Sequence, residues 1–132
     1  MKLKHILLIL SLSLFIFPSS SLAKCKEVAP KVKITKSGVQ LLNGKFVTCV
    51  DGLKYHEGSY KNGKRHGKWI IYFPREGHGR GAGKKYLIQI VRNYKNGKLD
   101  GEEWEYHDND TGTPSQKCIY NNGDMRECID YD

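Results

Sequence analysis

The sequence has little of what a helical or membrane-embedded protein needs. No segment keeps a convincing helical period over ten residues, and the only long apolar run lies at residues 6–17. That run is shorter than the roughly 20 residues that span a bilayer. We therefore expect no long helix, and no membrane span once the N-terminal segment has been removed.

Motifs for metal, nucleotide and calcium binding are missing as well. The four cysteines include no Cys-x-x-Cys spacing, which argues against a zinc site. The glycine-rich basic stretch at residues 74–85 is no phosphate loop, because Lys85 stands where Ser or Thr is required. Residues 108–112 lack the distal glutamate of a calcium loop and are predicted to form a turn. We expect neither a metal nor a cofactor.

No catalytic set is recognisable either. Nothing in the chain pairs a nucleophile with a base in a known motif. Three neighbouring glutamates are candidates for an acid/base pair, but a solvated acidic face is the simpler interpretation. They are Glu102, Glu103 and Glu105. We therefore predict that the protein is not an enzyme and has no catalytic residues.

The sequence does contain an internal repeat, which is the strongest guide to its fold. The stretch at 60–72 returns at 94–106: an aromatic residue leads into Lys-Asn-Gly-Lys, a second glycine follows four residues later, and a short apolar strand comes next. Asn-Gly is a strong hairpin signal because both residues accept a positive φ, and the second glycine suits a bulge. The positions that carry the repeat are Tyr60, Gly63, Gly67, Tyr72, Tyr94, Gly97, Gly101, Trp104, Tyr106, Tyr120 and Gly123.

Weaker copies extend the repeat in both directions. Residues 44–49 match residues 67–72, and residues 120–124 form a final half copy. Between the two better copies, the glycine-rich residues 74–84 are an insertion, predicted to be a flexible hairpin tip.

These copies predict an all-β fold class: a single-sheet antiparallel meander of stacked β-hairpins, stapled by disulfides. Asn43-Gly44 is predicted to be a turn between strands at 39–42 and 44–50. The predicted organisation is a signal peptide at 1–23, an N-terminal strand segment at 24–43, repeat hairpins at 44–124 with the insertion at 74–84, and an acidic C-terminal tail at 125–132.

Residues 56–67, which read His-Glu-Gly-Ser-Tyr-Lys-Asn-Gly-Lys-Arg-His-Gly, resemble the hairpin unit of the MORN repeat. The second copy has Arg92 where the first has Gly58, and Trp69 replaces a small residue in the return strand. These departures resemble the MORN-variant group, often labelled as the antitoxin component of toxin–antitoxin systems. The resemblance covers residues 44–123. It implies a platform of hairpins that interacts with proteins or lipids, and it carries over no catalytic residues.

The first 23 residues are predicted to be a secretory signal peptide. Lysines near the start precede the apolar run at 6–17, and Ser21-Leu-Ala23 forms a small-x-small cleavage site. A membrane anchor is the alternative, but the run is short for one. Lipidation is not expected, because Lys24 precedes Cys25 where a lipobox needs a small residue. We expect export to the periplasm or the medium of a bacterial host.

An even number of cysteines in a small exported chain predicts two disulfides. Four cysteines allow three pairings. Repeat architectures make mostly local contacts, which favours Cys25–Cys49 and Cys118–Cys128. Each bridge would then clamp one open end of the stack.

The two better copies differ between their faces. Strand residues alternate sides, so the matched pairs Ile70/Tyr72 and Trp104/Tyr106 predict a shared apolar core face. The other face carries Trp69, Ile71 and Phe73 in the first copy and Glu103, Glu105 and His107 in the second. Two interpretations of Trp69 and Phe73 stay open: cover by a loop or terminal segment, or an exposed aromatic patch that binds a partner.

Charge is segregated along a chain whose net charge is +8. Residues 61–98 hold 11 basic residues and one acidic residue, whereas residues 100–132 hold 10 acidic and two basic residues. The candidate anion-binding residues are Lys61, Lys64, Arg65, Lys68, Arg75, Arg80, Lys84 and Lys85. Nucleic acid is not the expected partner of an exported chain without a nucleic-acid motif. An acidic protein, an anionic lipid headgroup or a cell-envelope polymer fits better.

Two functional hypotheses follow. The first is a non-enzymatic exported binding module whose hairpin surface holds a protein or an anionic envelope partner. The second is an antitoxin or immunity-type protein that neutralises one specific toxin. A toxin-like open reading frame beside the gene would favour the second.

Overall fold

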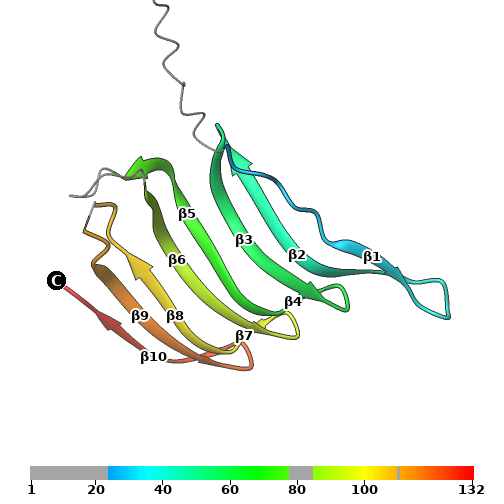
Figure 1. The fold of residues 1–132 in the computed structure, drawn as a ribbon. Helices are drawn as coiled ribbons and strands as arrows, with labels where there is room; N and C mark the ends of the chain where they lie inside the picture. Colours follow the sequence, from blue (N-terminus) through cyan, green and yellow to red (C-terminus); the bar gives the residue numbers. More distant parts are fainter. Residues whose placement is uncertain (1–23, 78–84, 110) are drawn as a thin grey trace, which may run out of the picture.

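The computed structural model describes residues 24–77, 85–109 and 111–132, which form one antiparallel β-sheet of consecutive hairpins (Figure 1). Within these residues there is no helix, and hence none long and apolar enough to cross a membrane. The sheet order is β1-β2-β3-β5-β6-β8-β9-β10, with β4 paired to β3 and β7 to β6. The strands are β1 (Lys31–Ile34), β2 (Gln40–Val50), β3 (Leu53–Lys61), β4 (Lys64–Arg65), β5 (Gly67–Gly77), β6 (Lys85–Lys95), β7 (Lys98–Leu99), β8 (Gly101–Tyr106), β9 (Pro114–Asn121) and β10 (Asp124–Asp130). The predicted fold class is confirmed.

Three Asn-Gly turns close the repeated hairpins. In each turn both central residues have a positive φ, as a type I′ turn requires. The φ values are 50° and 77° at Asn62-Gly63, 51° and 86° at Asn96-Gly97, and 52° and 96° at Asn122-Gly123. Type I′ turns match the right-handed twist of the strands they join, so the repeated dipeptide fixes both the position and the twist of each hairpin.

The second glycine of each better copy divides the return strand. Gly67 has φ 72° and separates β4 from β5, and Gly101 has φ 103° and separates β7 from β8. The short strand before the glycine pairs back within its own hairpin. After the glycine the chain also pairs forward, with Gly67 opposite Tyr94 and Gly101 opposite Tyr120. One glycine therefore links each hairpin to the next.

The prediction of a turn at Asn43-Gly44 is wrong. β2 runs unbroken through this dipeptide, and only Gly44 has a positive φ, at 102°. Asn43 pairs with Lys31 of β1, whereas Gly44 pairs with Tyr60 of β3. A type I′ turn needs a positive φ at both residues, so Gly44 acts instead as a second glycine at which β2 changes partner.

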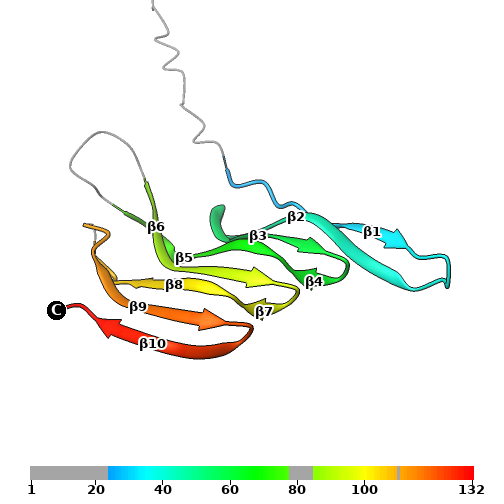
Figure 2. The same cartoon turned by 90° about the horizontal axis from the view of Figure 1, so that it is seen from below.

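A repeated backbone hydrogen bond joins successive hairpins. The N–H of each turn glycine donates to a backbone carbonyl of the preceding hairpin. The accepting residue lies two positions before the second glycine of that hairpin. The bonds are Gly63 N to Leu42 O at 2.9 Å, Gly97 N to Arg65 O at 2.9 Å and Gly123 N to Leu99 O at 2.8 Å. These bonds bring the turns into line along one edge of the sheet (Figure 2).

Burial in this sheet comes from neighbouring side chains on the same face. Among the described residues, the buried apolar side chains are Trp69, Tyr72, Leu87 and Cys118, and Glu103 is buried as well. The sequence predicted one core face that includes Tyr72 and an opposite face that is acidic in the second copy. That prediction is only half right, because Trp69 and Glu103 of the opposite face are each only 6% exposed.

Both predicted disulfides are confirmed, and each lies at one end of the stack. Cys25 and Cys49 have Cα atoms 6.0 Å apart, and the N–H of Cys25 donates to the carbonyl of Gly52. Cys118 and Cys128 lie opposite each other in the β9–β10 ladder, with Cα atoms 4.1 Å apart. The first bridge ties the chain before β1 to β2, and the second ties the final hairpin.

Candidate functional site

The Asn-Gly turns lie along one edge of the sheet (Figure 2), and the residues that flank two of these turns are opposed lysines. Lys61 lies directly across from Lys64 in the first turn, and Lys95 lies directly across from Lys98 in the second. All four side chains are exposed. We call these four residues the turn ridge.

Packing between hairpins continues this ridge from one turn to the next. A Cβ added at Gly97 would lie 3.4 Å from the Cβ of Lys64, so the stem of that lysine runs beside the following turn. The stem of Lys98 lies beside Gly123 in the same way. Among the described residues, the one ion pair of the ridge joins Lys95 to Asp100 at 4.0 Å. Within the described residues, the four cations of the ridge therefore have this one ion-pair partner, at a long distance, and Asp124 takes the equivalent position in the third turn.

Arg65, the residue after the first turn, folds its guanidinium over two aromatic rings. Its Cζ lies 5.1 Å from the ring centre of Trp69 and 5.4 Å from that of Tyr94. One guanidinium nitrogen also donates a hydrogen bond to the Tyr94 hydroxyl at 3.1 Å. That hydrogen bond raises the pKa of Arg65, against the smaller opposing effect of burial. The sequence predicted Arg65 as an anion-binding residue, and the structure also gives it a packing role.

Trp69 is at the centre of an aromatic cluster on the same face. Its ring lies 5.5 Å from Phe46, 5.2 Å from Tyr60 and 6.1 Å from Tyr94, measured between ring centroids. Its Nε1 donates to the carbonyl of Ser59 at 3.1 Å. Trp69 is therefore buried by side chains of β2, β3 and β6, so neither a covering loop nor an exposed aromatic patch describes it. Phe73 is half-buried.

Gly58 makes room for this tryptophan. A Cβ at Gly58 would lie 2.3 Å from the Trp69 ring, a distance that side-chain carbons do not reach. The indole therefore lies flat on the backbone of β3. The absence of a side chain at Gly58 is what allows Trp69 to fit in this copy.

An open hollow of about 270 Å³ lies on this face. Arg65, Trp69 and Tyr94 line it, together with His56 and Arg92. The Nδ1 of His56 lies 3.1 Å from the Thr48 hydroxyl. Burial lowers the pKa of His56, and the nearby charge of Arg65 lowers it further. The hollow thus combines aromatic walls with fixed guanidinium groups.

The second copy replaces the Gly58–Trp69 contact with an ion pair. Arg92 stands at the position of Gly58 and Glu103 at that of Trp69, and their side chains form a hydrogen-bonded ion pair. Burial lowers the pKa of Arg92, but the hydrogen bond and charge of Glu103 outweigh this and leave the pKa raised. The prediction that Glu103 belongs to a solvated acidic face is therefore wrong.

Sequence reasoning missed this pair although its signal was present. Arg92 in place of Gly58 and Glu103 in place of Trp69 are two departures at equivalent positions, each pair lying one residue beyond the last paired residues of its two strands. Glu102 does remain exposed, and its carboxylate lies 2.6 Å from the amine of Lys117. Hydrogen bonds from Lys117 and Trp104 lower the pKa of Glu102.

The opposite face has its own hydrogen-bonded acid, the half-buried Glu57. Its carboxylate accepts hydrogen bonds from the Tyr72 hydroxyl at 2.9 Å and from the Lys54 amine at 2.7 Å. Burial raises the pKa of Glu57, yet these partners lower it by more. Lys68 lines a second, more open hollow on this face. Lys68 therefore does not share a face with Arg65.

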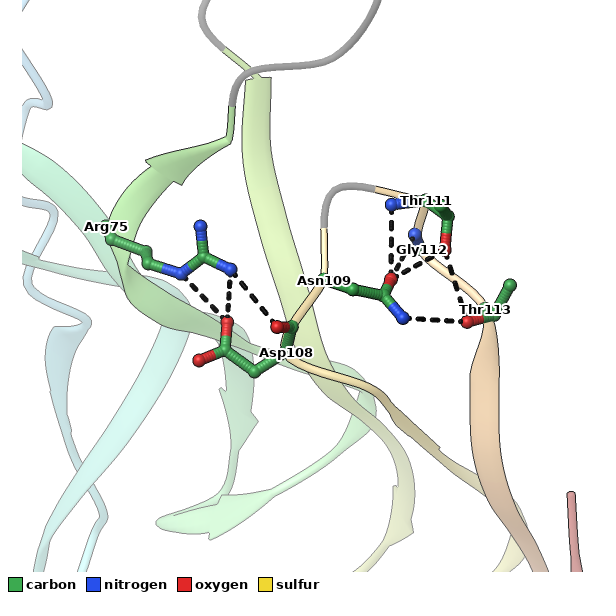
Figure 3. Close-up of polar contacts among 6 residues, drawn as sticks. All are labelled: Arg75, Asp108, Asn109, Thr111, Gly112 and Thr113. Carbon is green, nitrogen blue, oxygen red and sulfur yellow. Dashed lines mark hydrogen bonds and ion pairs between the residues drawn. The ribbon is translucent and has the colours of Figure 1, made fainter. Parts of the chain in front are cut away.

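Arg75 lies far from the turns. With a rise of about 3.3 Å per residue, it is roughly 30 Å along the strand from Arg65. Its guanidinium binds the Asp108 carboxylate at 2.6 Å and the Asp108 carbonyl at 3.3 Å (Figure 3). Arg75 therefore ties the end of β5 to the connection between β8 and β9.

The predicted turn after β8 is formed by asparagine (Figure 3). The side-chain carbonyl of Asn109 accepts hydrogen bonds from the N–H groups of Thr111 and Gly112 and from the Thr111 hydroxyl, the last at 2.6 Å. Such a turn satisfies its own backbone. In the described part of the chain, no group of three or more His, Cys, Asp or Glu residues could hold a metal ion.

The predicted binding residues are therefore not brought together as one set. Lys61, Lys64 and Arg65 lie at the turn edge, and Arg75 lies near the other end of β5. Arg80 and Lys84 lie outside the described residues, and only the backbone of Lys85 is described, opposite Gly77. Lys95 and Lys98 were missing from the predicted set, although their Lys-Asn-Gly-Lys motif repeats that of Lys61 and Lys64.

These features define a class of protein: an open, single-layer sheet of stacked hairpins whose candidate site is a row of lysines along the turns. Comparison of the chain with protein-family models, curated proteins and solved structures finds no match.

Proposed function

We propose that the protein is a non-enzymatic, exported binding module that uses the turn ridge to hold an anionic partner. The observation that carries the proposal is the repeated pair of opposed lysines, Lys61 with Lys64 and Lys95 with Lys98. Like charges directly opposite each other destabilise an antiparallel pair. An anionic partner would neutralise that repulsion. Its binding should therefore also stabilise the two hairpins.

The chemistry of the ridge favours a partner with several anionic groups. Exposed amines bind phosphate and carboxylate oxygens as point charges without fixing one geometry. Anionic lipid headgroups, an acidic envelope polymer and an acidic protein surface share this chemistry. Each lysine near an anionic membrane contributes about 1 kcal/mol, so four lysines on one edge are enough for measurable attachment.

Three further features support the proposal. Both disulfides are compatible with an oxidising location outside the cytoplasm. The resemblance to MORN repeats implies an interaction platform. The predicted signal peptide would deliver the chain to the cell envelope, where anionic lipids and polymers are abundant.

The test is a binding assay with vesicles of anionic phosphatidylglycerol, vesicles of neutral phosphatidylcholine, and polyglutamate. We expect binding to an anionic probe and none to phosphatidylcholine. Raising the salt should weaken binding, because exposed charges are screened beyond about 8 Å at physiological ionic strength. The Lys61→Glu/Lys64→Glu variant should bind at least about tenfold more weakly.

The matched control reverses two lysines away from the ridge. Lys24 and Lys26 are exposed and lie beside the Asp51-Gly52 turn, at the other end of the strands. The Lys24→Glu/Lys26→Glu variant has the same net charge as the ridge variant and should bind like the wild type. Equal weakening in both variants would show that only net charge matters. Salt-independent binding, or no binding to either anionic probe, would overturn the proposal.

A further inference from the structure

The sheet ends in two open edges, at β1 and at β10 (Figure 1), and the sequences of these edges carry opposite charges. At one end, β1 and the residues before and after it form the basic edge, residues 24–36, with five lysines and one acidic residue. At the other end, β10 and the residues that follow it form the acidic edge, residues 124–132, with four acidic residues and one arginine. Each edge presents backbone groups that no further strand of the described residues pairs.

Charges at the two edges have few partners inside the described part of the chain. The five lysines of the basic edge form no ion pair there, and Glu27 accepts a hydrogen bond from the Cys49 N–H. At the acidic edge, Asp124 lies 3.8 Å from Arg126, and Asp130 accepts a hydrogen bond from Gln116. The remaining charge of each edge is exposed to solvent.

The direction of the strands allows these edges to meet. Eight strands make up the main path of the sheet, and each is antiparallel to its neighbour. The first and last strands, β1 and β10, therefore run in opposite directions. A second copy placed beyond β10 in the same orientation would present its β1 antiparallel to β10, so the alternation of the sheet would continue.

Charge excludes the symmetric alternatives. Pairing of β1 with another β1 would oppose lysine with lysine, and pairing of β10 with another β10 would oppose acid with acid, and both arrangements are unfavourable. Pairing of β1 with β10 opposes unlike charges. It would also cover apolar side chains that stand more than half exposed, namely Val32 and Ile34 on β1 and Met125 on β10.

We propose that a second copy of this chain docks on the sheet edge, with β1 of one copy pairing to β10 of the next. The contact is head to tail, and such a contact does not close on itself unless the rotation between copies forms a ring. The sheet would then extend through a chain of copies. The turn ridges of successive copies would follow one another along the same edge of the extended sheet.

The test is sedimentation velocity on the full chain, using the form that the cell accumulates with both disulfides formed. At low salt we expect the weight-average mass to rise continuously with protein concentration, by more than about twofold over the series. At high salt the rise should be reduced, because the attraction between edges is screened. A monomer at every concentration, or a plateau at the dimer, would overturn the proposal.

Charge reversal tests the edges directly. In Lys31→Glu/Lys33→Glu the strand β1 becomes acidic and the former basic edge holds three lysines against three acidic residues, and in Asp124→Lys/Glu127→Lys both edges are basic. Each variant alone should stay monomeric. An equal mixture should associate again, because each edge then finds an opposite edge on the other variant. A mixture that stays monomeric while the wild type associates would show that the edges are not the contact.

The ridge variant Lys61→Glu/Lys64→Glu is the matched control for assembly. It should associate like the wild type although it loses the anionic probes. Assembly without ligand binding would leave the edge contact standing and overturn the ridge function. If the wild type binds an anionic probe but is monomeric at every concentration, the ridge function stands and the edge contact is overturned.

Discussion

At the residue scale, one cross-strand site shows how the repeat tolerates change. Gly58 and Trp69 occupy it in the first copy, and Arg92 and Glu103 occupy it in the second. The first pair fits because one member has no side chain, and the second fits because the two charges satisfy each other. A mixed pair would fail in either direction, because a side chain in place of Gly58 would clash with the Trp69 indole, and a glycine in place of Arg92 would leave Glu103 buried without its cation.

A double-mutant cycle measures this dependence. Arg92→Met leaves Glu103 buried without its cation, and removal of one partner of a buried pair costs about 3–5 kcal/mol. Because the Arg92 side chain is 29% exposed, we expect a smaller loss of about 2–4 kcal/mol in the free energy of unfolding. Arg92→Met/Glu103→Leu should regain much of that loss, as measured by urea denaturation. Additive losses in the two single variants would show that the pair does not act as a unit.

At the element scale, the type I′ turn is the unit on which the stack is built. The turn glycines need a positive φ, and each also lies beside the hairpin before it. A Cβ at Gly63 would lie 3.3 Å from a methyl group of Leu41, and one at Gly97 would lie 3.4 Å from Lys64. Each turn therefore serves its own hairpin and the contact between hairpins.

Substitution of Gly97 separates backbone strain from simple loss of a glycine. At φ 86°, valine is strained because its branched Cβ clashes with the backbone, whereas asparagine adopts a positive φ at lower cost. We expect Gly97→Val to lower the free energy of unfolding by more than about 1 kcal/mol, and Gly97→Asn to lower it by clearly less. Urea denaturation of both variants is the measurement. Equal losses would mean that the turn conformation is not the cause.

At the scale of the whole molecule, the sequence was sufficient for the architecture because each hairpin is encoded locally. The Asn-Gly dipeptides, the second glycines and the local cysteine pairs all correspond to features of the sheet. The errors arose where a contact depends on register between copies. The burial of Trp69, the pairing of Glu103 and the path of β2 through Asn43-Gly44 depend on which residues face each other across strands. Period and composition do not contain that information.

The site was predictable to the same extent. Lys61, Lys64 and Arg65 follow from their place beside a turn, and the repeat of the same motif should have added Lys95 and Lys98. Charge alone could not show that Arg75 lies away from the turn edge, because its contact with Asp108 joins segments that are distant in the sequence. Local signals therefore identify the turn edge, and long-range contacts decide which cations belong to it.

The last prediction concerns how the stack unfolds. Each hairpin contacts only its neighbours, so stability should be a sum of hairpin and interface terms. Cys118 and Cys128 are 10 residues apart in sequence. In the chain-entropy model, a bridge that closes a loop of this length contributes about 2.7 kcal/mol to the free energy of unfolding. We expect Cys118→Ala/Cys128→Ala to speed amide hydrogen exchange in β9 and β10 while exchange in β5 stays unchanged. Cys25→Ala/Cys49→Ala is the matched control, with faster exchange confined to the other end. Loss of protection throughout the sheet in either variant would show that the molecule unfolds as one cooperative unit.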